Sequence, residues 1–191
     1  MKYDVAIIGG GPAGMMAAGR AAELGARVVL LEKKSRLGIK LLATGGGRAN
    51  ITNQRDARSM ANSFGYNGRW LLSGLSKFGP EDTIAFFNQL GLKTKVESDG
   101  RVFSRSNSAT DVWQILINYL ETGKVDIKPE AIVKKLVRVG DRIEKIILTD
   151  NSEIIADKFI ICTGGRSYPQ TGSTGDGYKW LKQLGHQIIT P

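Results

Sequence analysis

The 191-residue chain has one cysteine, Cys162, and one histidine, and these scarcities narrow its chemistry. A single cysteine excludes an internal disulfide, a Cys-x-x-Cys redox centre and a cysteine-rich metal site, and we expect no bound metal. We interpret Cys162 as an inert, buried thiol. The apolar runs are also too short for a membrane span. These absences predict a protein of a reducing compartment, and we expect it to be soluble and cytoplasmic.

The chain also lacks a long run of one charge, although 27 Lys and Arg against 18 Asp and Glu give a net charge of +9. The basic residues are scattered, and no aromatic-basic signature of RNA binding occurs. We interpret the charge as solvated surface together with a few groups that face phosphate. This distribution disfavours a nucleic-acid partner. The length suffices for one substantial core.

Glycine is abundant, and its most informative cluster lies in residues 5–14, V-A-I-I-G-G-G-P-A-G. The apolar, branched residues 5–8 predict a buried strand of a parallel sheet. The glycines then match G-x-G-x-x-G, the turn that joins such a strand to a helix and cradles a pyrophosphate. Proline suits the first helical turn, whose free N–H groups attract an anion. The predicted cofactor-binding residues of this turn are Gly9, Gly11, Pro12, Ala13 and Gly14, of which all but Pro12 are expected to bind the pyrophosphate.

An acidic residue at the end of the next strand supports this interpretation. The helix is expected to stop at Gly25, a second apolar strand covers Val28–Leu31, and Glu32 follows it. A carboxylate there accepts hydrogen bonds from both ribose hydroxyls of an adenosine and repels a 2′-phosphate. The alternative is a plain glycine loop with Glu32 in water. These residues alone leave open whether the dinucleotide is FAD or NAD.

Residues 33–53 form a second glycine-rich segment, which we interpret as a ligand loop. Gly45, Gly46 and Gly47 can present main-chain N–H groups, and Arg48 adds a planar fork of donors suited to phosphate or to the polar edge of a flavin. Asn50 contributes further hydrogen-bonding groups. The alternative is a flexible surface loop with Arg48 in water.

The middle of the chain predicts helices over residues 69–78 and 80–90, then a short strand pair. We assign Trp70, Leu71, Phe86 and Phe87 to packing, because aromatic residues at helical spacing usually belong to a core. A helix over 109–122 leads to a strand at 125–128, which we expect beside the first strand.

Residues 131–156 alternate in short segments with turns, which predicts a β-meander. The next strand, 159–162, runs into Thr163-Gly164-Gly165, and a short helix is expected over 178–184. The fold class is therefore α/β, a doubly wound sheet whose four parallel strands leave no closing strand.

Three stretches carry a resemblance that spacing alone does not. The run K-L-L-A-T-G-G-G-R-A-N-I-T-N, residues 40–53, resembles the signature of a family of bacterial NAD(P)/FAD-dependent oxidoreductases that includes BaiN and aminoacetone oxidase. Residues 100–106, G-R-V-F-S-R-S, and 166–178, R-S-Y-P-Q-T-G-S-T-G-D-G-Y, are similar to further parts of it. Ala49 stands where most members have cysteine, so any role of that thiol is absent here.

This resemblance implies an FAD-binding Rossmann-type domain over residues 1–191, with a β-meander crossover at 130–157 and a small helical insertion at 54–108. It implies flavin-dependent two-electron chemistry on a small-molecule substrate, with NAD(P)H as a possible electron donor. The family's members are about twice as long, so we expect an incomplete domain whose C-terminal half is missing. The further cofactor-binding residues are Lys33, Lys40, Gly46, Gly47, Arg48, Asn50, Ile132, Thr163, Gly164 and Gly165. Among these, the main chain at Ile132 is expected at the adenine edge.

No residue is nominated as a catalytic acid or base, since electron transfer at a flavin need not require one from this segment. Three alternatives remain open: an NAD-dependent dehydrogenase domain, a noncatalytic flavin-binding fragment and an RNA-modifying flavoprotein.

Overall fold

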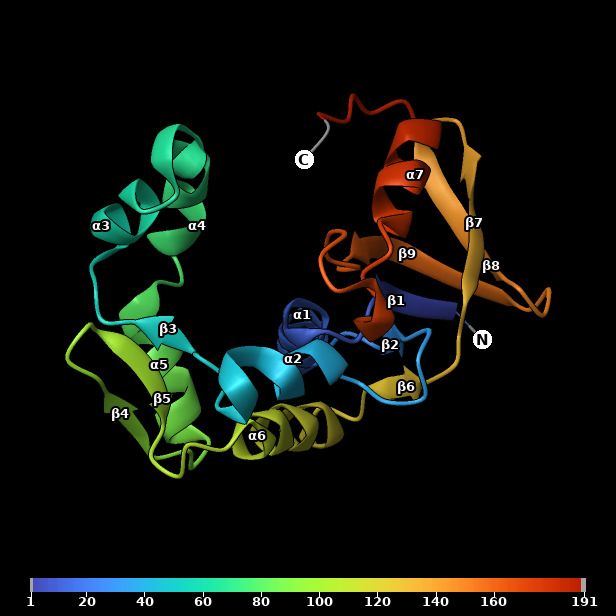
Figure 1. Ribbon diagram of the computed structural model, residues 1–191. Helices are drawn as coiled ribbons and strands as arrows, with labels where there is room; N and C mark the ends of the chain where they lie inside the picture. The colour runs from blue at the N-terminus through green and yellow to red at the C-terminus, as the bar shows by residue number, and fades with distance from the viewer. Residues whose placement is uncertain (1, 190–191) are drawn as a thin grey trace. The chain divides into compact units, whose positions relative to one another are not determined.

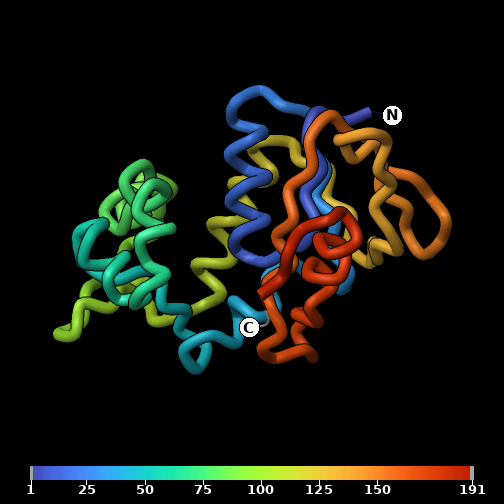
Figure 2. The backbone as a smooth tube through the Cα atoms, turned by 90° about the horizontal axis from the view of Figure 1, so that it is seen from above, coloured from blue at the N-terminus to red at the C-terminus, as the bar shows by residue number. Residues whose placement is uncertain are grey.

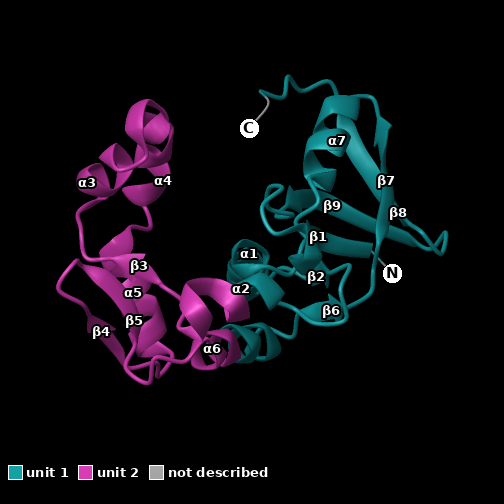
Figure 3. Cartoon of the chain, in the orientation of Figure 1, with its two compact units in different colours: residues 1–40, 116–191 teal, residues 41–115 magenta. Residues whose placement is uncertain are grey.

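The computed structural model describes residues 2–189, which divide into two compact units (Figure 3). The first unit combines residues 1–40 with 116–191, and the second consists of residues 41–115. The second unit thus contains the expected insertion at 54–108 and extends beyond it in both directions.

The first unit is built on a six-stranded sheet in the order β6-β2-β1-β9-β8-β7 (Figure 1). Its elements are β1 (Lys2–Ile8), α1 (Pro12–Glu23), β2 (Val28–Leu31), β6 (Asp126–Lys128), β7 (Val133–Val139), β8 (Arg142–Leu148), β9 (Glu153–Ile161), a 3-10 turn (Pro169–Thr171) and α7 (Asp176–Gln183). Strands β6, β2, β1 and β9 are parallel, whereas β8 and β7 add an antiparallel hairpin at one edge. The predicted strand–turn–helix–strand unit and the four parallel strands are therefore confirmed.

Helices cover both faces of this sheet, as a doubly wound fold requires. Ala6 and Ile8 of β1 face a core that includes Leu31 and Trp180 of α7. Because successive side chains of a strand alternate between faces, Ile7 points to the opposite side, which α1 covers. Figure 2 shows α1 lying along the strands. Apolar side chains are thus packed on both faces of the strands that end at the site.

The prediction that the strand at 125–128 lies beside the first strand is wrong, because β6 (126–128) lies beside β2. It pairs with β2, with Leu30 opposite Ile127. The right-handed crossover rule sets the hand of a connection but not the neighbour of the strand. Both edges of β1 are already occupied by β2 and β9, so the free edge of β2 receives β6.

The last strand of the β-meander and the parallel strand predicted after it are one nine-residue strand, β9. Residues Glu153–Ile155 of β9 pair antiparallel with β8, and Ile155–Ile161 pair parallel with β1. The predicted meander (131–156) and the predicted next strand (159–162) are therefore joined through Asp157 and Lys158. The strand continues through them because both are exposed, and Asp157 forms a 2.5 Å ion pair with Lys2 on β1. The predicted short C-terminal helix is confirmed as α7.

The second unit combines small helices with a three-stranded sheet in the order β3-β5-β4. It contains a 3-10 turn (Thr44–Gly47), β3 (Thr52–Asn53), α3 (Ala57–Asn62), a second 3-10 segment (Gly65–Leu71), α4 (Leu72–Leu75), α5 (Pro80–Gln89), β4 (Thr94–Val96) and β5 (Arg101–Ser104). Two helices cross the boundary between the units in sequence, α2 (Ile39–Ala43) and α6 (Ala109–Thr122).

Two expectations for this unit are wrong. The helix predicted over 69–78 is a 3-10 segment followed by the single turn of α4. Trp70 and Leu71 are 74% and 42% exposed and do not serve as core residues, whereas Phe87 is buried as expected. Gly74 lies in the middle of the predicted helix, and glycine disfavours a helix interior, which agrees with the short length of α4.

Candidate functional site

A cleft of about 520 Å³ opens at the carboxyl ends of the three central parallel strands. Ile8 of β1, Leu31 of β2 and Ile161 of β9 reach it, and the residues that follow each strand form its floor. In open parallel sheets, ligands bind at this edge of the strands, and the volume lies within the usual range for ligand pockets.

The turn from β1 to α1 is shaped by two glycines that no other residue can replace without movement. Gly9 has a φ of +107°, and a Cβ there would lie 2.5 Å from the carbonyl oxygen of Cys162. A Cβ on Gly14 would lie 1.8 Å from the carbonyl oxygen of Gly9, so Gly14 permits α1 to pack directly against the turn. The two glycines therefore aim the start of α1 at the cleft.

Gly11 has a different role, because a Cβ there would meet no atom within 4 Å and the residue lines the cleft. It is the N-cap of α1, no side chain caps the helix, and Pro12 follows at the first helical position. The N–H groups of the first helical turn have no partner within a helix. They create a positive site that suits an anion such as a diphosphate.

Glu32 is held at the edge of the cleft by the main chain. One carboxylate oxygen accepts from the N–H of Gly10 at 2.7 Å and the other from the N–H of Lys34 at 2.8 Å. A carboxylate has further lone pairs on both oxygens, so Glu32 retains acceptor capacity toward the cleft. The side chain is thus fixed where a ribose would be expected beside the glycine turn.

The start of the β-meander lies next to Glu32. The N–H of Ala131 donates to the carbonyl oxygen of Glu32 at 2.9 Å, and the carbonyl of Ile132 accepts from the N–H of Thr149 at 2.9 Å. Ile132 is 45% exposed and lines the cleft. These bonds bring Ile132 to the same end of the cleft as Glu32. Its contact with an adenine stays a prediction.

The segment after β9 forms another wall. Cys162, Thr163 and Gly164 line the cleft. Cys162 is half-buried, and this burial raises the pKa of its thiol, which agrees with an inert role. Gly164 adopts a φ of +68°, with Ser173 packed close to the place of a Cβ. Gly165 follows this wall but does not line the cleft.

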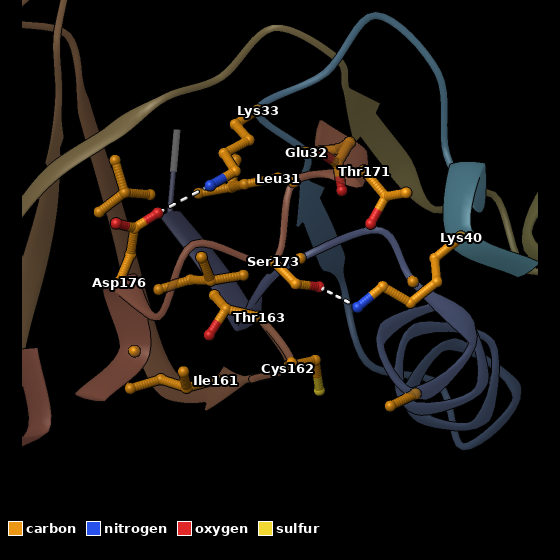
Figure 4. A pocket seen from close by; sticks show the side chains of 18 of the residues that line it. Leu31, Glu32, Lys33, Lys40, Ile161, Cys162, Thr163, Thr171, Ser173 and Asp176 are labelled. Atoms are coloured by element: carbon orange, nitrogen blue, oxygen red, sulfur yellow. Dashed lines mark hydrogen bonds and ion pairs between the residues drawn. The ribbon is translucent and has the colours of Figure 1, made fainter. Parts of the chain in front are cut away.

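The two lysines expected at the cofactor already have protein partners (Figure 4). The ammonium of Lys33 donates to Thr174 at 2.6 Å and to Asp176 at 2.8 Å. Lys40 donates to the hydroxyl of Ser173 at 2.6 Å, and also to a main-chain carbonyl. Both lysines line the cleft, but their charged ends join its rim to the segment before α7.

Burial alone would raise the pKa of Asp176, but the hydrogen bonds from Lys33 and Thr174 outweigh it and lower the pKa below its usual value. Asp176 is therefore ionised at neutral pH and forms a true ion pair with Lys33.

The remaining predicted residues belong to the second unit. Gly46 and Gly47 have φ values of +66° and +86°, and the main chain there is open. Arg48 forms an ion pair with Glu97 and lies 4.0 Å above the ring of Phe103. These contacts hold the glycine loop on β5. A contact of Gly46, Gly47, Arg48 or Asn50 with a cofactor stays a prediction.

Residues 166–175 and α7 also contribute to the cleft, although no residue in either was predicted to bind the cofactor. The additional lining residues include Thr171, Gly172, Ser173, Asp176, Trp180 and Leu181. The sequence did contain an indication that this segment matters, because residues 166–178 form the third stretch that resembles the family. The sequence could not show that this stretch returns to the glycine turn.

A parallel sheet, a glycine turn at a helix N-terminus and a fixed acid after the second strand define a dinucleotide-binding Rossmann domain. Comparison with known families agrees, since the HI0933-like protein Rossmann domain matches residues 3–191. The chain belongs to this family.

Individual relatives align in sequence with nearly the whole chain. A 3-dehydro-bile acid delta(4,6)-reductase of Clostridium scindens is 35% identical over 96% of this chain and 44% of its own length. A ribosomal RNA dihydrouridine synthase of Escherichia coli is 29% identical over 98% of this chain and 46% of its own. The chain thus spans less than half the length of these relatives.

Solved structures support the fold at lower sequence identity. The 3-ketosteroid-delta4-(5alpha)-dehydrogenase of Rhodococcus jostii aligns with a TM-score of 0.75 at 16% identity, over 97% of this chain and 54% of that one. A flavocytochrome c3 fumarate reductase aligns with a TM-score of 0.69 at 18% identity, over 97% and 41%. Within residues 2–189, no helix is long and apolar enough to cross a membrane.

Proposed function

We propose that the cleft binds FAD and that the chain is the FAD-binding portion of a flavin-dependent oxidoreductase. One observation carries this proposal: the uncapped start of α1 at Gly11 and the fixed carboxylate of Glu32 meet in a single cleft. An anion site beside a ribose acceptor is what the diphosphate and sugar of an adenine dinucleotide require.

Each part of the cleft has a role in this arrangement. The N–H groups of Gly11, Ala13 and Gly14 would bind the diphosphate, and the free lone pairs of Glu32 would accept from the ribose. The main chain at Ile132 would meet the adenine. Thr163, Gly164 and Gly165 would pass beneath the cofactor, and the glycine loop around Arg48 would approach its flavin end.

FAD is preferred over NAD for two reasons. The sequence resembles a flavoprotein family over its glycine loops, and a flavocytochrome has the same fold. The bound flavin would supply the two-electron chemistry, while this chain's residues bind and orient it.

The test is to purify the intact protein and identify its native ligand. We expect flavin absorbance bands and, by mass spectrometry of the released ligand, the mass of FAD. A preparation that contains NAD, or that takes up no flavin when FAD is added, would contradict the proposal. Turnover with a reductant and an electron acceptor would exclude a noncatalytic flavin-binding role.

We further infer that the intact protein works in the cytoplasm on a small-molecule substrate with NAD(P)H as electron donor. The longer relatives support the view that a C-terminal portion completes the site. Mixing the oxidised flavoprotein anaerobically with NADH or NADPH tests the donor, because reduction bleaches the flavin band.

An RNA substrate is a second candidate, favoured by the similarity to a ribosomal RNA dihydrouridine synthase and by the net charge of +9. RNA binding that releases counterions weakens steeply as salt increases. Titration of fluorescent ribosomal RNA fragments at several salt concentrations separates the candidates. A small-molecule enzyme would show neither tight RNA binding nor such a slope.

A further inference from the structure

The segment between β9 and α7 crosses the rim of the cleft with unusually little support from its own main chain. We call residues 166–175 the strap. Its main-chain hydrogen bonds, such as those from Thr171 to Tyr168 and from Gly172 to Pro169, all close local turns. The N–H of Tyr178 in α7, which directly follows the strap, donates to the carbonyl of Gly175 at 3.2 Å. In the described part of the chain, no main-chain hydrogen bond joins the strap to an element that is distant in the sequence.

The strap also contains backbone conformations with positive φ, one of them at a residue other than glycine. Tyr168 has a φ of +55°, in the left-handed region that non-glycine residues rarely adopt. Gly172 and Gly175 have φ values of +106° and +78°. A segment of this kind keeps its place only when contacts elsewhere hold it.

Those contacts come from the two lysines on the opposite side of the cleft (Figure 4). Lys40 reaches both the carbonyl of Ser167, near the start of the strap, and the hydroxyl of Ser173, near its end. Lys33 reaches Thr174 and, just beyond the strap, Asp176. The Lys33–Asp176 pair is only 27% and 30% exposed, so water and salt screen it less than a surface pair.

Both lysines follow β2, whereas the strap follows β9. Their bonds therefore connect opposite sides of the cleft above the glycine turn. Thr171, Gly172 and Ser173 of the strap line the cleft, so a strap that moved away would open it.

We propose that Lys33 and Lys40 are positioning residues that hold the strap across the cleft and thereby slow release of the bound dinucleotide. The inference rests on the proposed function and adds a role that differs from direct phosphate binding. Release requires the strap to detach, so the strength of the lysine contacts sets the release rate.

The experiment measures release of FAD from the loaded, intact protein, followed by the fluorescence of free flavin after dilution. Loss of a hydrogen-bonded contact between charged groups should speed release about tenfold or more. We expect this result for Lys33→Met, with a weaker dependence of release on salt. Lys33→Arg should restore slow release, and Lys182→Met, which removes an exposed charge from α7, should leave it unchanged.

Asp176→Asn distinguishes the strap from a direct phosphate contact. If Lys33 holds the strap, Asp176→Asn speeds release as Lys33→Met does, and the double variant is little faster than either single variant. If Lys33 binds the diphosphate, loss of its competing partner leaves release unchanged or slower, which overturns the proposal. Thr174→Val, which removes only a hydroxyl group, provides a second test should Asp176→Asn fail to fold.

The two proposals fail in different ways. A protein that binds no FAD overturns the proposed function and this inference together. If the protein binds FAD but Lys33→Met, Lys40→Met and Asp176→Asn leave the release rate unchanged, only the role of the strap is overturned.

Discussion

Replacing Gly14 by alanine would insert a methyl group where α1 meets the turn after β1. The new Cβ would lie 1.8 Å from the carbonyl oxygen of Gly9, and 3.4 Å from the Cβ of Cys162. Overpacking typically costs about 1–3 kcal/mol. The closest neighbour is a main-chain atom and cannot rotate away, so we expect the free energy of unfolding to fall by about 3 kcal/mol.

Gly11→Ala is the matched control, because the same methyl group then meets open space. Gly11 has a φ of −75°, which alanine adopts readily, and no atom lies within 4 Å of the added Cβ. We expect a loss of unfolding free energy below about 1 kcal/mol, mainly because alanine caps a helix poorly. The methyl group would instead occupy the approach of the diphosphate, and FAD affinity should fall at least about tenfold.

Thermal unfolding with and without added FAD measures both effects. For a domain of this size, about 2–4 °C of Tm accompanies each kcal/mol, so Gly14→Ala should lower Tm by about 6–12 °C. Gly11→Ala should lower the Tm of the ligand-free protein by less than about 4 °C and lose most of the increase in Tm caused by FAD. The reasoning is refuted if the two variants destabilise the ligand-free protein equally, or if Gly11→Ala binds FAD normally.

Three further predictions use other parts of the structure. Glu32→Gln should weaken FAD binding by about ten- to a hundredfold, since an amide NH₂ would face one of the two main-chain N–H groups; unchanged affinity in a flavin titration would contradict this. Burial, together with the hydrogen bond to Asp126, raises the pKa of Tyr3 from 10.0 to about 12. The neutral phenol therefore stabilises the folded state fully below pH 10.0, and this stabilisation declines as the pH rises toward 12. Urea unfolding should show a decline of up to about 2 kcal/mol that Tyr3→Phe removes, and an equal decline in both proteins would exclude Tyr3 as its source. Phe103→Ala should cost about 3–5 kcal/mol, because Phe103 is 1% exposed and also supports Arg48; calorimetry that detects no loss would show that the second unit does not depend on this ring.

The secondary structure of the first 32 residues could be predicted from the sequence, because its signals act locally. Four apolar residues, glycines at fixed spacing, a proline at the helix start and an acid after the next strand each act on their immediate neighbours. The structure confirms β1, α1 and β2, and it places Gly11 and Glu32 at one cleft.

Residues that act over long distances in the chain were harder to predict. The sequence analysis assigned Lys33 and Lys40 to the cofactor, because a cation beside a phosphate-binding turn is a reasonable ligand. A contact of these lysines with a cofactor stays a prediction, but the sequence did not indicate that they also bond to Ser173 and Asp176, which lie more than 130 residues away. No periodicity relates the two segments. The predicted neighbour of β6 is wrong, because it depends on which strand edges remain free.

The sequence by itself determined the glycine turn between β1 and α1, the acid after β2 and the alternation of strands and helices. These follow from main-chain sterics and apolar periodicity within a few residues. Only the tertiary structure decided that β9 is one strand, that Trp70 is exposed and that Lys33 and Lys40 bond to residues near the C-terminal helix. Such features depend on which surfaces meet when the sheet assembles, and free edges, burial and ion pairs exist only after it has done so.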